Sequence, residues 1–148
     1  MAGQLTNTGQ KTLGIFPGSF NPWHAGHEDV LIKAIGLTDQ LIVAQLQNSS
    51  KPAAEPIPQS TIDSWSGAFG VTFIRKTDSL LVDLAADLGA THIIRGIRFG
   101  NLTEELELAL VTEELSKGRL ITILLPASRE HIVTSSTVRR DLSRFGRS

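Results

Sequence analysis

The sequence predicts one α/β domain of the Rossmann-like kind, in which a five-stranded parallel sheet carries helices on both faces. Five short apolar runs alternate along the chain with segments whose apolar residues recur at helical spacing. The apolar runs are continuous, which is typical of strands that are buried on both faces. The chain has 148 residues, 41% of them hydrophobic, which is enough for one domain with one sizeable core.

The first half of the predicted fold follows from turn signals around two apolar runs. A strand over 12–16 ends at Pro17-Gly18, and a helix begins near Glu28. Its apolar stripe is Val30, Leu31, Ala34 and Ile35, and Gly36 offers a stop. The run LIVAQL at 41–46 predicts the second strand. The segment 51–59 holds three prolines and must be a loop, and a short helix over 60–68 follows it.

The second half repeats the alternation three more times. The remaining strands are predicted at 71–74, 91–94 and 120–125. A helix over 79–88 turns Leu80, Leu81, Leu84, Ala85 and Leu88 inward, with Asp78 or Ser79 as its cap and Gly89 at its end. A long acidic helix begins at Asn101 or Thr103 and runs to about Ser116. The last helix, over 135–145, is predicted by Val138, Leu142 and Phe145.

Composition narrows the class of protein. The net charge of −1 argues against a nucleic-acid partner that is bound by bulk electrostatics. The chain has no cysteine, and no stretch approaches the ~20 apolar residues of a membrane span. The polar residues 1–11 are expected to form a flexible tail before a domain over 12–148, and we expect a cytoplasmic protein without a membrane partner.

The first chemical motif, Gly14 to His27 (GIFPGSFNPWHAGH), places a glycine- and proline-rich turn between a strand and a helix. Backbone N–H groups at a helix N-terminus bind phosphate, and glycine allows its oxygens to approach closely. A histidine that donates a hydrogen bond there can stabilise charge on a phosphoryl group. His24 and His27 could instead be a helix cap and a buried polar residue, but the preceding PGSFNP favours the phosphate site.

Three further segments lie at predicted strand ends. In HIIRGIR, Arg95 and Arg98 offer planar forks of donors for phosphate, or they pair with the acidic residues at 104, 105 and 107. The hydroxyl run Thr134 to Thr137 supplies donors for a polyphosphate, whereas plain capping needs only one of them. Lys51 is a bridge between phosphates or a solvated lysine. Its loop, rich in proline and alanine, is expected to be mobile and to close over substrates.

Together these segments resemble the nucleotidyltransferase superfamily with the H-x-G-H signature, and within it the phosphopantetheine adenylyltransferases of coenzyme A synthesis. The resemblance runs from Leu13 to Phe145, and its most specific stretch is 79–98 (SLLVDLAADLGATHIIRGIR). It implies transfer of an adenylyl group from ATP to 4'-phosphopantetheine, giving dephospho-coenzyme A and pyrophosphate. It also implies Mg²⁺ that arrives with ATP, no metal site in the protein itself, and a homo-oligomer, in this family a hexamer.

The resemblance also implies roles for individual residues. His27 and Lys51 match the catalytic positions, and Ser19, Lys51, Leu81 and Arg95 match contacts to the acceptor. The positions that match nucleotide contacts are Ser19, Phe20, His24, His27, Gly96, Ile97, Arg98, Glu105, Glu130, His131, Ile132, Val133, Thr134, Ser135 and Ser136.

Some positions depart from the family pattern. Asn21 replaces a usual Asp, His24 a usual Thr and Glu104 a usual Tyr, and one residue is missing between Arg98 and Glu105. The segment 56–65 stands where the family has a Glu-Glu-Arg helix. Two alternatives therefore stay open. One is a sibling transferase for another phosphate acceptor, such as nicotinate mononucleotide, and the other is a nucleotide-binding module without catalysis.

Overall fold

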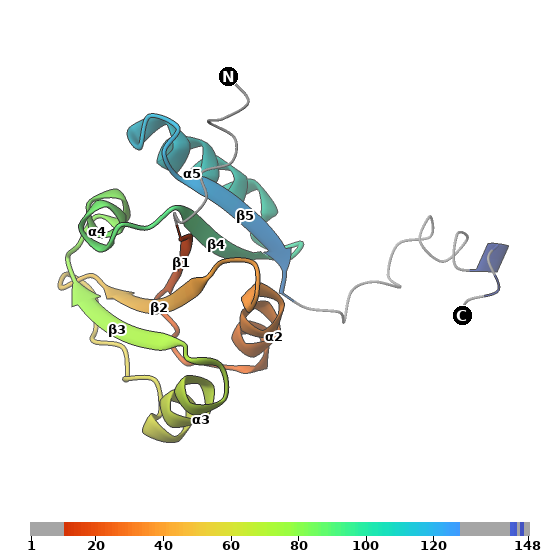
Figure 1. Ribbon diagram of the computed structural model, residues 1–148, viewed down its shortest axis with the longest axis horizontal. Helices are drawn as coiled ribbons and strands as arrows, with labels where there is room; N and C mark the ends of the chain where they lie inside the picture. Colours follow the sequence, from red (N-terminus) through yellow and green to blue (C-terminus); the bar gives the residue numbers. More distant parts are fainter. Residues whose placement is uncertain (1–10, 128–142, 145, 147–148) are drawn as a thin grey trace.

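The computed structural model describes residues 11–127, 143, 144 and 146 (Figure 1). Most of the predicted tail at 1–11, the nucleotide-contact positions Glu130 to Ser136 and most of the predicted helix at 135–145 lie outside the described residues. The described part contains a parallel sheet and four helices. It therefore confirms the predicted fold class.

The sheet has the strand order β3-β2-β1-β4-β5. Its strands are β1 (Leu13–Gly18), β2 (Gln40–Gln47), β3 (Thr72–Thr77), β4 (His92–Ile97) and β5 (Ile121–Pro126). Every neighbouring pair is parallel, with registers such as Phe16 opposite Val43 and Ile15 opposite Ile93. The chain moves outward from β1 to β3 and then crosses back to β4, so the direction of winding reverses between β1 and β4. In sheets of this kind, ligands bind beyond the carboxyl ends of the strands at that reversal.

Two helices cover each face of the sheet (Figure 1). They are α2 (Ala25–Ala34), α3 (Gln59–Phe69), α4 (Leu81–Leu88) and α5 (Leu102–Leu115). Glycines with positive φ follow α3 and α4, at Gly70 (φ 68°) and Gly89 (φ 73°), where a side chain would be strained. None of the helices in the described part of the chain is long and apolar enough to cross a membrane.

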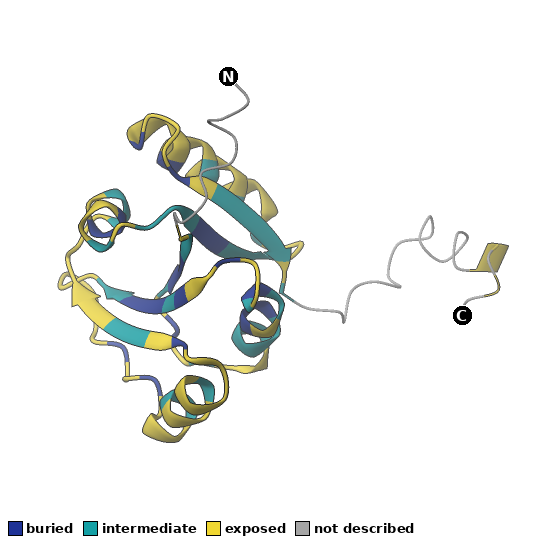
Figure 2. Cartoon of the chain, viewed as in Figure 1, coloured by how far each residue is buried: buried dark blue, intermediate teal, exposed yellow. Residues whose placement is uncertain are grey.

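Successive residues of the central strands face opposite cores. Phe16, Val43 and Ile94 pack under α2 and α3, whereas their neighbours Ile15, Ala44 and Ile93 pack under α4. All six are at most 3% exposed. Figure 2 shows the centre of the sheet in the dark blue of buried residues. This alternation explains why the strands are apolar without a break: each buries both of its faces.

Several boundaries differ from the predictions. The first helix begins at Ala25 rather than Glu28, because His24 acts as its cap. Leu80 was expected to face inward, but it is the residue before α4 and is 56% exposed. Neither Asp78 nor Ser79 caps that helix, and the Asp78 carboxylate instead accepts hydrogen bonds from Ser49.

The two tryptophans, Trp23 and Trp65, pack against the core that α2 and α3 cover. Both indole N–H groups donate to the same carboxylate oxygen of Glu28, Trp23 at 3.2 Å and Trp65 at 3.5 Å. The ring of Trp23 also packs against Phe73 with centroids 6.1 Å apart. Trp65 ends the segment 56–65 that departs from the family pattern, and its contact with Glu28 ties that segment to α2, the helix that carries His27.

Candidate active site

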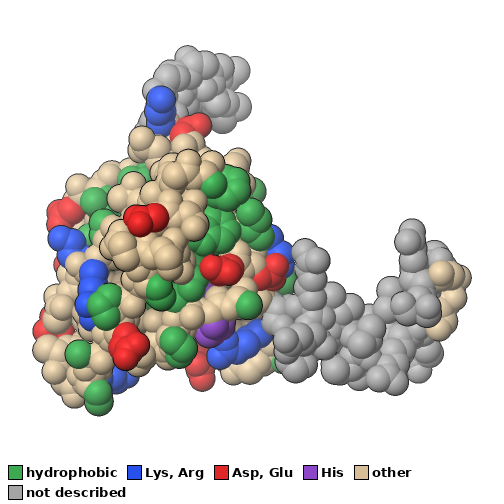
Figure 3. Space-filling view, turned by 90° about the horizontal axis from the view of Figure 1, so that it is seen from below, with side chains coloured by type: hydrophobic (Ala, Val, Ile, Leu, Met, Phe, Trp, Pro, Cys, Tyr) green, Lys and Arg blue, Asp and Glu red, His purple; other side chains and the backbone are tan. Residues whose placement is uncertain are grey.

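A cavity of about 610 Å³ opens at the carboxyl ends of β1 and β4, where the winding of the sheet reverses. This volume is in the range of small-molecule sites. The residues that line it are Phe16, Pro17, Gly18, Ser19, Phe20, His24, Ala25, Gly26, His27, Val30, Arg95, Gly96, Arg98, Asn101, Glu105 and Ala127. On the face shown in Figure 3, a histidine side chain lies beside basic side chains.

One wall of the cavity is the turn that follows β1. Phe20 has φ 47° yet is only 3% exposed, an unusual conformation for a bulky residue. Its ring packs edge-on against Phe16 with centroids 5.1 Å apart, and it covers Gly18 so closely that a Cβ there would lie 2.9 Å from the ring. The strained backbone is therefore held by aromatic packing, which gives the turn one shape before a ligand binds.

The two histidines form a hydrogen-bonded pair at the start of α2. The backbone N–H of Gly26 donates to His24 Nδ1 at 3.0 Å, and the backbone N–H of His24 donates to His27 Nδ1 at 3.1 Å. The rings are stacked with centroids 3.8 Å apart. Since both Nδ1 atoms accept hydrogen bonds, the neutral rings carry their hydrogens on Nε2. Neither Nε2 has a protein partner among the described residues.

The glycine between the histidines is required by this arrangement. A Cβ at Gly26 would lie 2.8 Å from His24 Cε1, closer than real Cβ contacts come. Any larger residue would push the His24 ring away from the backbone N–H that it caps. The spacing H-x-G-H thus places two rings and one close contact within a single helical turn.

The charge state of His27 follows from its surroundings. Burial, the neighbouring His24 and the nearby Arg98 together lower the pKa of His27 from 6.5 to about 4. The His27 ring packs edge-on against Phe20, with ring centroids 4.9 Å apart, and at a tilt against Trp23, with ring centroids 5.4 Å apart. At neutral pH it is therefore an uncharged, oriented N–H donor on the cavity wall. Such a preorganised donor stabilises negative charge that develops in a transition state.

The opposite wall comes from the end of β4 and the start of α5. Arg95 Nε donates to Glu105, and both side chains are 17% exposed. The pairing of an arginine with an acidic helix residue, one of the two readings of the sequence, is therefore formed by Arg95. The guanidinium of Arg98, in contrast, has no hydrogen-bond partner within the part of the chain that the structure describes.

Two residues shape this wall in ways that the motifs did not predict. Asn101 accepts from the backbone N–H of Arg98 at 2.8 Å and donates to the carbonyl of Gly96 at 3.3 Å, which closes the turn between them. A Cβ at Gly96 would lie 2.8 Å from Val30 Cγ2, so only glycine fits against α2. The sequence predicted Asn101 only as one of two residues at which the long acidic helix could begin. Its second role depends on a turn geometry that spacing does not reveal.

Of the predicted site residues that the structure describes, most but not all line the cavity. Ser19, Phe20 and both histidines line it, together with Arg95, Gly96, Arg98 and Glu105. Leu81, Lys51 and Ile97 do not. Leu81 packs against the core under α4, and Lys51 is exposed in the turn after β2.

The comparisons with known proteins agree with this arrangement. Residues 15–61 match the family model described as cytidylyltransferase-like. A phosphopantetheine adenylyltransferase from Cutibacterium acnes is 36% identical over 130 residues, covering 85% of this chain and 81% of that protein. One from Lacticaseibacillus casei is 31% identical over 140 residues, covering 92% of this chain and 83% of that protein.

A solved structure supports the fold alone. The lipopolysaccharide core biosynthesis protein from Thermoplasma volcanium has a TM-score of 0.54 and 18% identity, and the match covers 80% of this chain and 98% of that one. The sequence relatives go further than the fold, because they exceed 30% identity over most of both chains. These relatives show that the chain belongs to the phosphopantetheine adenylyltransferase family.

Proposed function

We propose that the protein transfers the adenylyl group of ATP to 4'-phosphopantetheine, giving dephospho-coenzyme A and pyrophosphate. The observation that carries this proposal is the set of unengaged donors on the cavity wall: the Nε2–H groups of His24 and His27 and the guanidinium of Arg98. Donors of this kind, converging from two strand ends, suit a polyphosphate. Family membership supplies the identity of the two substrates.

The reaction needs no general base. A phosphate oxygen of the acceptor, already ionised at neutral pH, attacks the α-phosphorus of ATP in line. The new oxygen–phosphorus bond forms as the bond between the α-phosphorus and the α,β-bridging oxygen breaks, and pyrophosphate leaves with that electron pair. Catalysis therefore consists of positioning and charge stabilisation. The neutral His27 Nε2–H serves the α-phosphate, and Arg98 serves the departing phosphates.

Four residues are proposed to hold the acceptor, and one of them, Ser19, lines the cavity in the turn after β1. Arg95 lies on the cavity wall, and its partner Glu105 keeps the guanidinium in place. Leu81 and Lys51 lie outside the cavity, at the neighbouring strand ends of β3 and β2, where a long acceptor arm would extend. A phosphate on an uncharged arm thus meets a guanidinium at one end and apolar surface along its length.

We further propose that Mg²⁺ enters with the nucleotide. Among the described residues that line the cavity, Glu105 is the only carboxylate, and it is paired with Arg95. Oxygen ligands for the ion would therefore come chiefly from phosphate groups and water, as Mg²⁺ prefers. Bound in this way, the ion would neutralise part of the charge on the phosphates.

The test is pyrophosphate release from ATP and Mg²⁺ with a panel of acceptors. We expect turnover with 4'-phosphopantetheine and little with nicotinate mononucleotide or glycerol phosphate. Preferred turnover of another acceptor would move the protein to the sibling transferases. If every acceptor fails while ATP still binds in calorimetric titration, the protein is a non-catalytic nucleotide-binding module.

A homo-oligomer is also proposed, as the family resemblance implies. Helix α5 is exposed along most of its length, although it carries leucines on several sides (Figure 2). Leu106, Leu110 and Ile121 are each about half exposed or more, at 49%, 60% and 57%. An exposed apolar surface of this kind is typical of an interface between subunits. Sedimentation of the purified chain tests this, and a monomer at working concentration would contradict it.

A further inference from the structure

The turn that carries Lys51 is held on its N-terminal side by a residue that directly follows the neighbouring strand β3. Asp78, directly after β3, accepts the backbone N–H of Ser49 at 2.9 Å and its hydroxyl at 2.6 Å. The Asp78 backbone has φ 55°, a left-handed conformation that Asp and Asn adopt more readily than most residues. The carboxylate therefore fixes the position of Ser49 two residues before the lysine.

The downstream side is held by a buried amide. Gln45 is only 2% exposed, and its side-chain nitrogen donates to the carbonyl of Ser19 at 3.0 Å and to that of Glu55 at 2.9 Å. Ser19 lines the cavity, so one side chain connects the cavity wall to the loop after Lys51. Buried donors of this kind are costly to leave unpaired, which favours the closed arrangement.

A second downstream attachment lies at Ala54. Its backbone N–H donates to Gln47 Oε1 at 3.3 Å, and its carbonyl accepts from the guanidinium of Arg75, which also donates to Gln47 Oε1 at 2.9 Å. Ala54 and Ile57 are buried at 8% and 6% exposure. The loop expected to be mobile is thus attached on both sides. Within the turn, Asn48 also accepts hydrogen bonds from Ser50, at 2.9 Å and 2.7 Å, and from the backbone N–H of Lys51 at 3.0 Å.

We propose that Asp78 is a positioning residue of the adenylyl transfer, which holds the turn of Lys51 at the carboxyl end of β2 before substrates bind; this rests on the proposed function. The side chain of Lys51 remains exposed and has no partner among the residues that the structure describes. Its ammonium group is therefore available to the phosphates. Asp78 acts through the position of the turn and does not touch substrate.

The variants that test this role are chosen for the left-handed backbone. Asp78→Gly removes the carboxylate without strain at φ 55°, whereas Asp78→Asn keeps a hydrogen-bond acceptor and tolerates the same backbone. A matched control is Asp39→Ala. Asp39 accepts the backbone N–H of Thr12 at 2.7 Å and its hydroxyl at 3.2 Å in the same manner, but before β2 rather than at the end of a strand.

Each variant is measured alone and with Lys51→Ala for kcat, for KM of both substrates, and for ATP affinity by calorimetry. We expect Asp78→Gly to lower kcat roughly tenfold, as a misplaced catalytic group does, while ATP affinity changes less than twofold. Asp78→Asn should recover most of that loss, and Asp39→Ala should leave kcat unchanged. In the Lys51→Ala background, Asp78→Gly should cost at most about twofold, because two residues that act through one another are not additive.

Three results would overturn the role of Asp78: an equal loss with and without Lys51, no recovery by Asp78→Asn, or a kcat of Asp78→Gly that matches the parent. If the parent itself shows no turnover with any acceptor, the proposed function fails instead. Amide exchange then still reports on the turn. Slow exchange at Ser49 that becomes fast in Asp78→Gly supports the attachment, and fast exchange in the parent contradicts it.

Discussion

The two ends of the sheet use the same residue types for different purposes. At the amino end, Thr91 Oγ1 accepts the backbone N–H of Leu13 at 3.0 Å and pairs with His92 Nδ1 at 2.7 Å, while Asp39 accepts from Thr12. At the carboxyl end, Nδ1 of His24 and of His27 accepts a hydrogen bond from a backbone N–H, but the Nε2 atoms are left to the cavity. The polar side chains named at the amino end thus bond within the protein. The two histidines at the carboxyl end bond to the protein through Nδ1 and leave Nε2 for a ligand.

The difference teaches what a site requires beyond the right residues. His24 and His27 become donors because the backbone occupies Nδ1 of each ring and aromatic packing fixes the ring of His27. Backbone shape at that end is also constrained, by Phe20 with its positive φ and by glycines that admit no Cβ. Both features are preorganisation, which lowers the cost of binding and of charge stabilisation.

The largest expected effect is a loss of turnover on replacing a histidine at the carboxyl end of the sheet, compared with replacing one at the amino end. His27→Ala should lower turnover by roughly 10²–10³, the scale for one lost oxyanion-type donor. His92→Ala, at the amino end, should leave turnover unchanged and lower the Tm instead, because it removes a contact to Thr91. Steady-state kinetics and thermal unfolding check both. A folded His27→Ala protein whose turnover lies within a few-fold of the parent's would contradict the catalytic role of His27.

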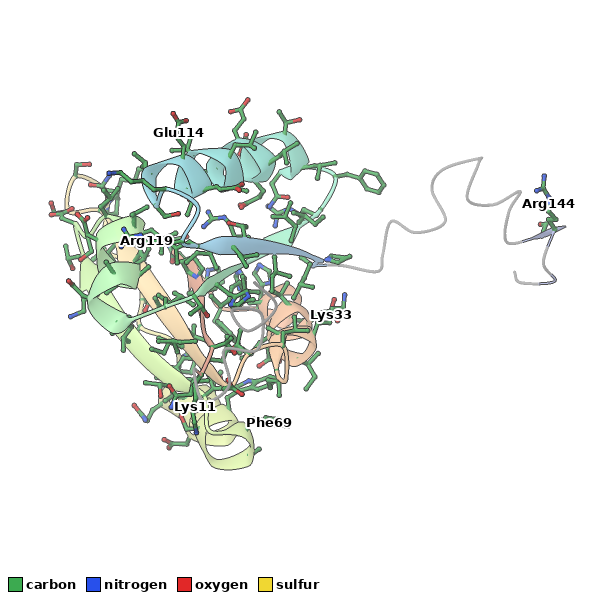
Figure 4. The ribbon with its side chains drawn as sticks, turned by 45° about the horizontal axis from the view of Figure 1, so that its top comes forward. Lys11, Lys33, Phe69, Glu114, Arg119 and Arg144 are labelled. Carbon is green, nitrogen blue, oxygen red and sulfur yellow. The ribbon has the colours of Figure 1, made fainter. Side chains whose placement is uncertain are left out.

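A smaller effect is expected from the arginines. Arg95→Ala should weaken the free energy of binding of 4'-phosphopantetheine by roughly 1.5–3 kcal/mol, the value of a lost charge-assisted contact, and so raise its Kd, while ATP affinity changes much less. Arg119→Ala, whose side chain donates to the Ser116 carbonyl near the start of β5, should change neither affinity (Figure 4). Calorimetric titration of both ligands measures this. Equal losses of ATP and acceptor in Arg95→Ala would remove Arg95 from the acceptor site.

The pKa of His27 offers a sharper test that needs no substrate. Because the folded pKa lies near 4 and that of an unfolded histidine near 6.5, the unfolded chain binds a proton between these values and the folded chain does not. The free energy of unfolding should therefore fall as pH drops from 6.5 towards 4, and part of this dependence should vanish in His27→Ala. An NMR titration of the His27 ring should show a midpoint near 4, and one near 6.5 would contradict the burial argument.

The smallest effect is expected at the amino end. Asp39→Ala should lower the Tm slightly and leave kcat unchanged, because its carboxylate holds Thr12 and nothing in the cavity. Hydrogen bonds from Thr12 lower the pKa of Asp39 below its usual 3.8, so its contribution is present at neutral pH and is lost as pH falls through the folded value. Thermal unfolding at pH 7 and pH 3 measures this. Reduced kcat in Asp39→Ala would show that the two ends are coupled.

Local pattern predicted much of this molecule. All five strands and the four described helices appear near their predicted positions. Apolar runs and apolar stripes predicted the strands, α2 and α4, because burial sets the spacing of apolar residues there. The turn after β1 and the H-x-G-H motif were likewise predictable, since they act within a few residues of one another. The family, too, was visible in the run at 79–98.

The tertiary structure decided what depends on residues distant in sequence. Asp78 looked like a helix cap, but the pairing of β2 with β3 brings it to Ser49, 29 residues away. A loop with three prolines looked mobile, but Gln45 and Arg75 on neighbouring strands hold it. The sequence by itself thus determined the elements and the chemistry at their ends. Strand order and register decided which of those ends meet, because a hydrogen bond depends on distance and angle in space, which no local spacing specifies.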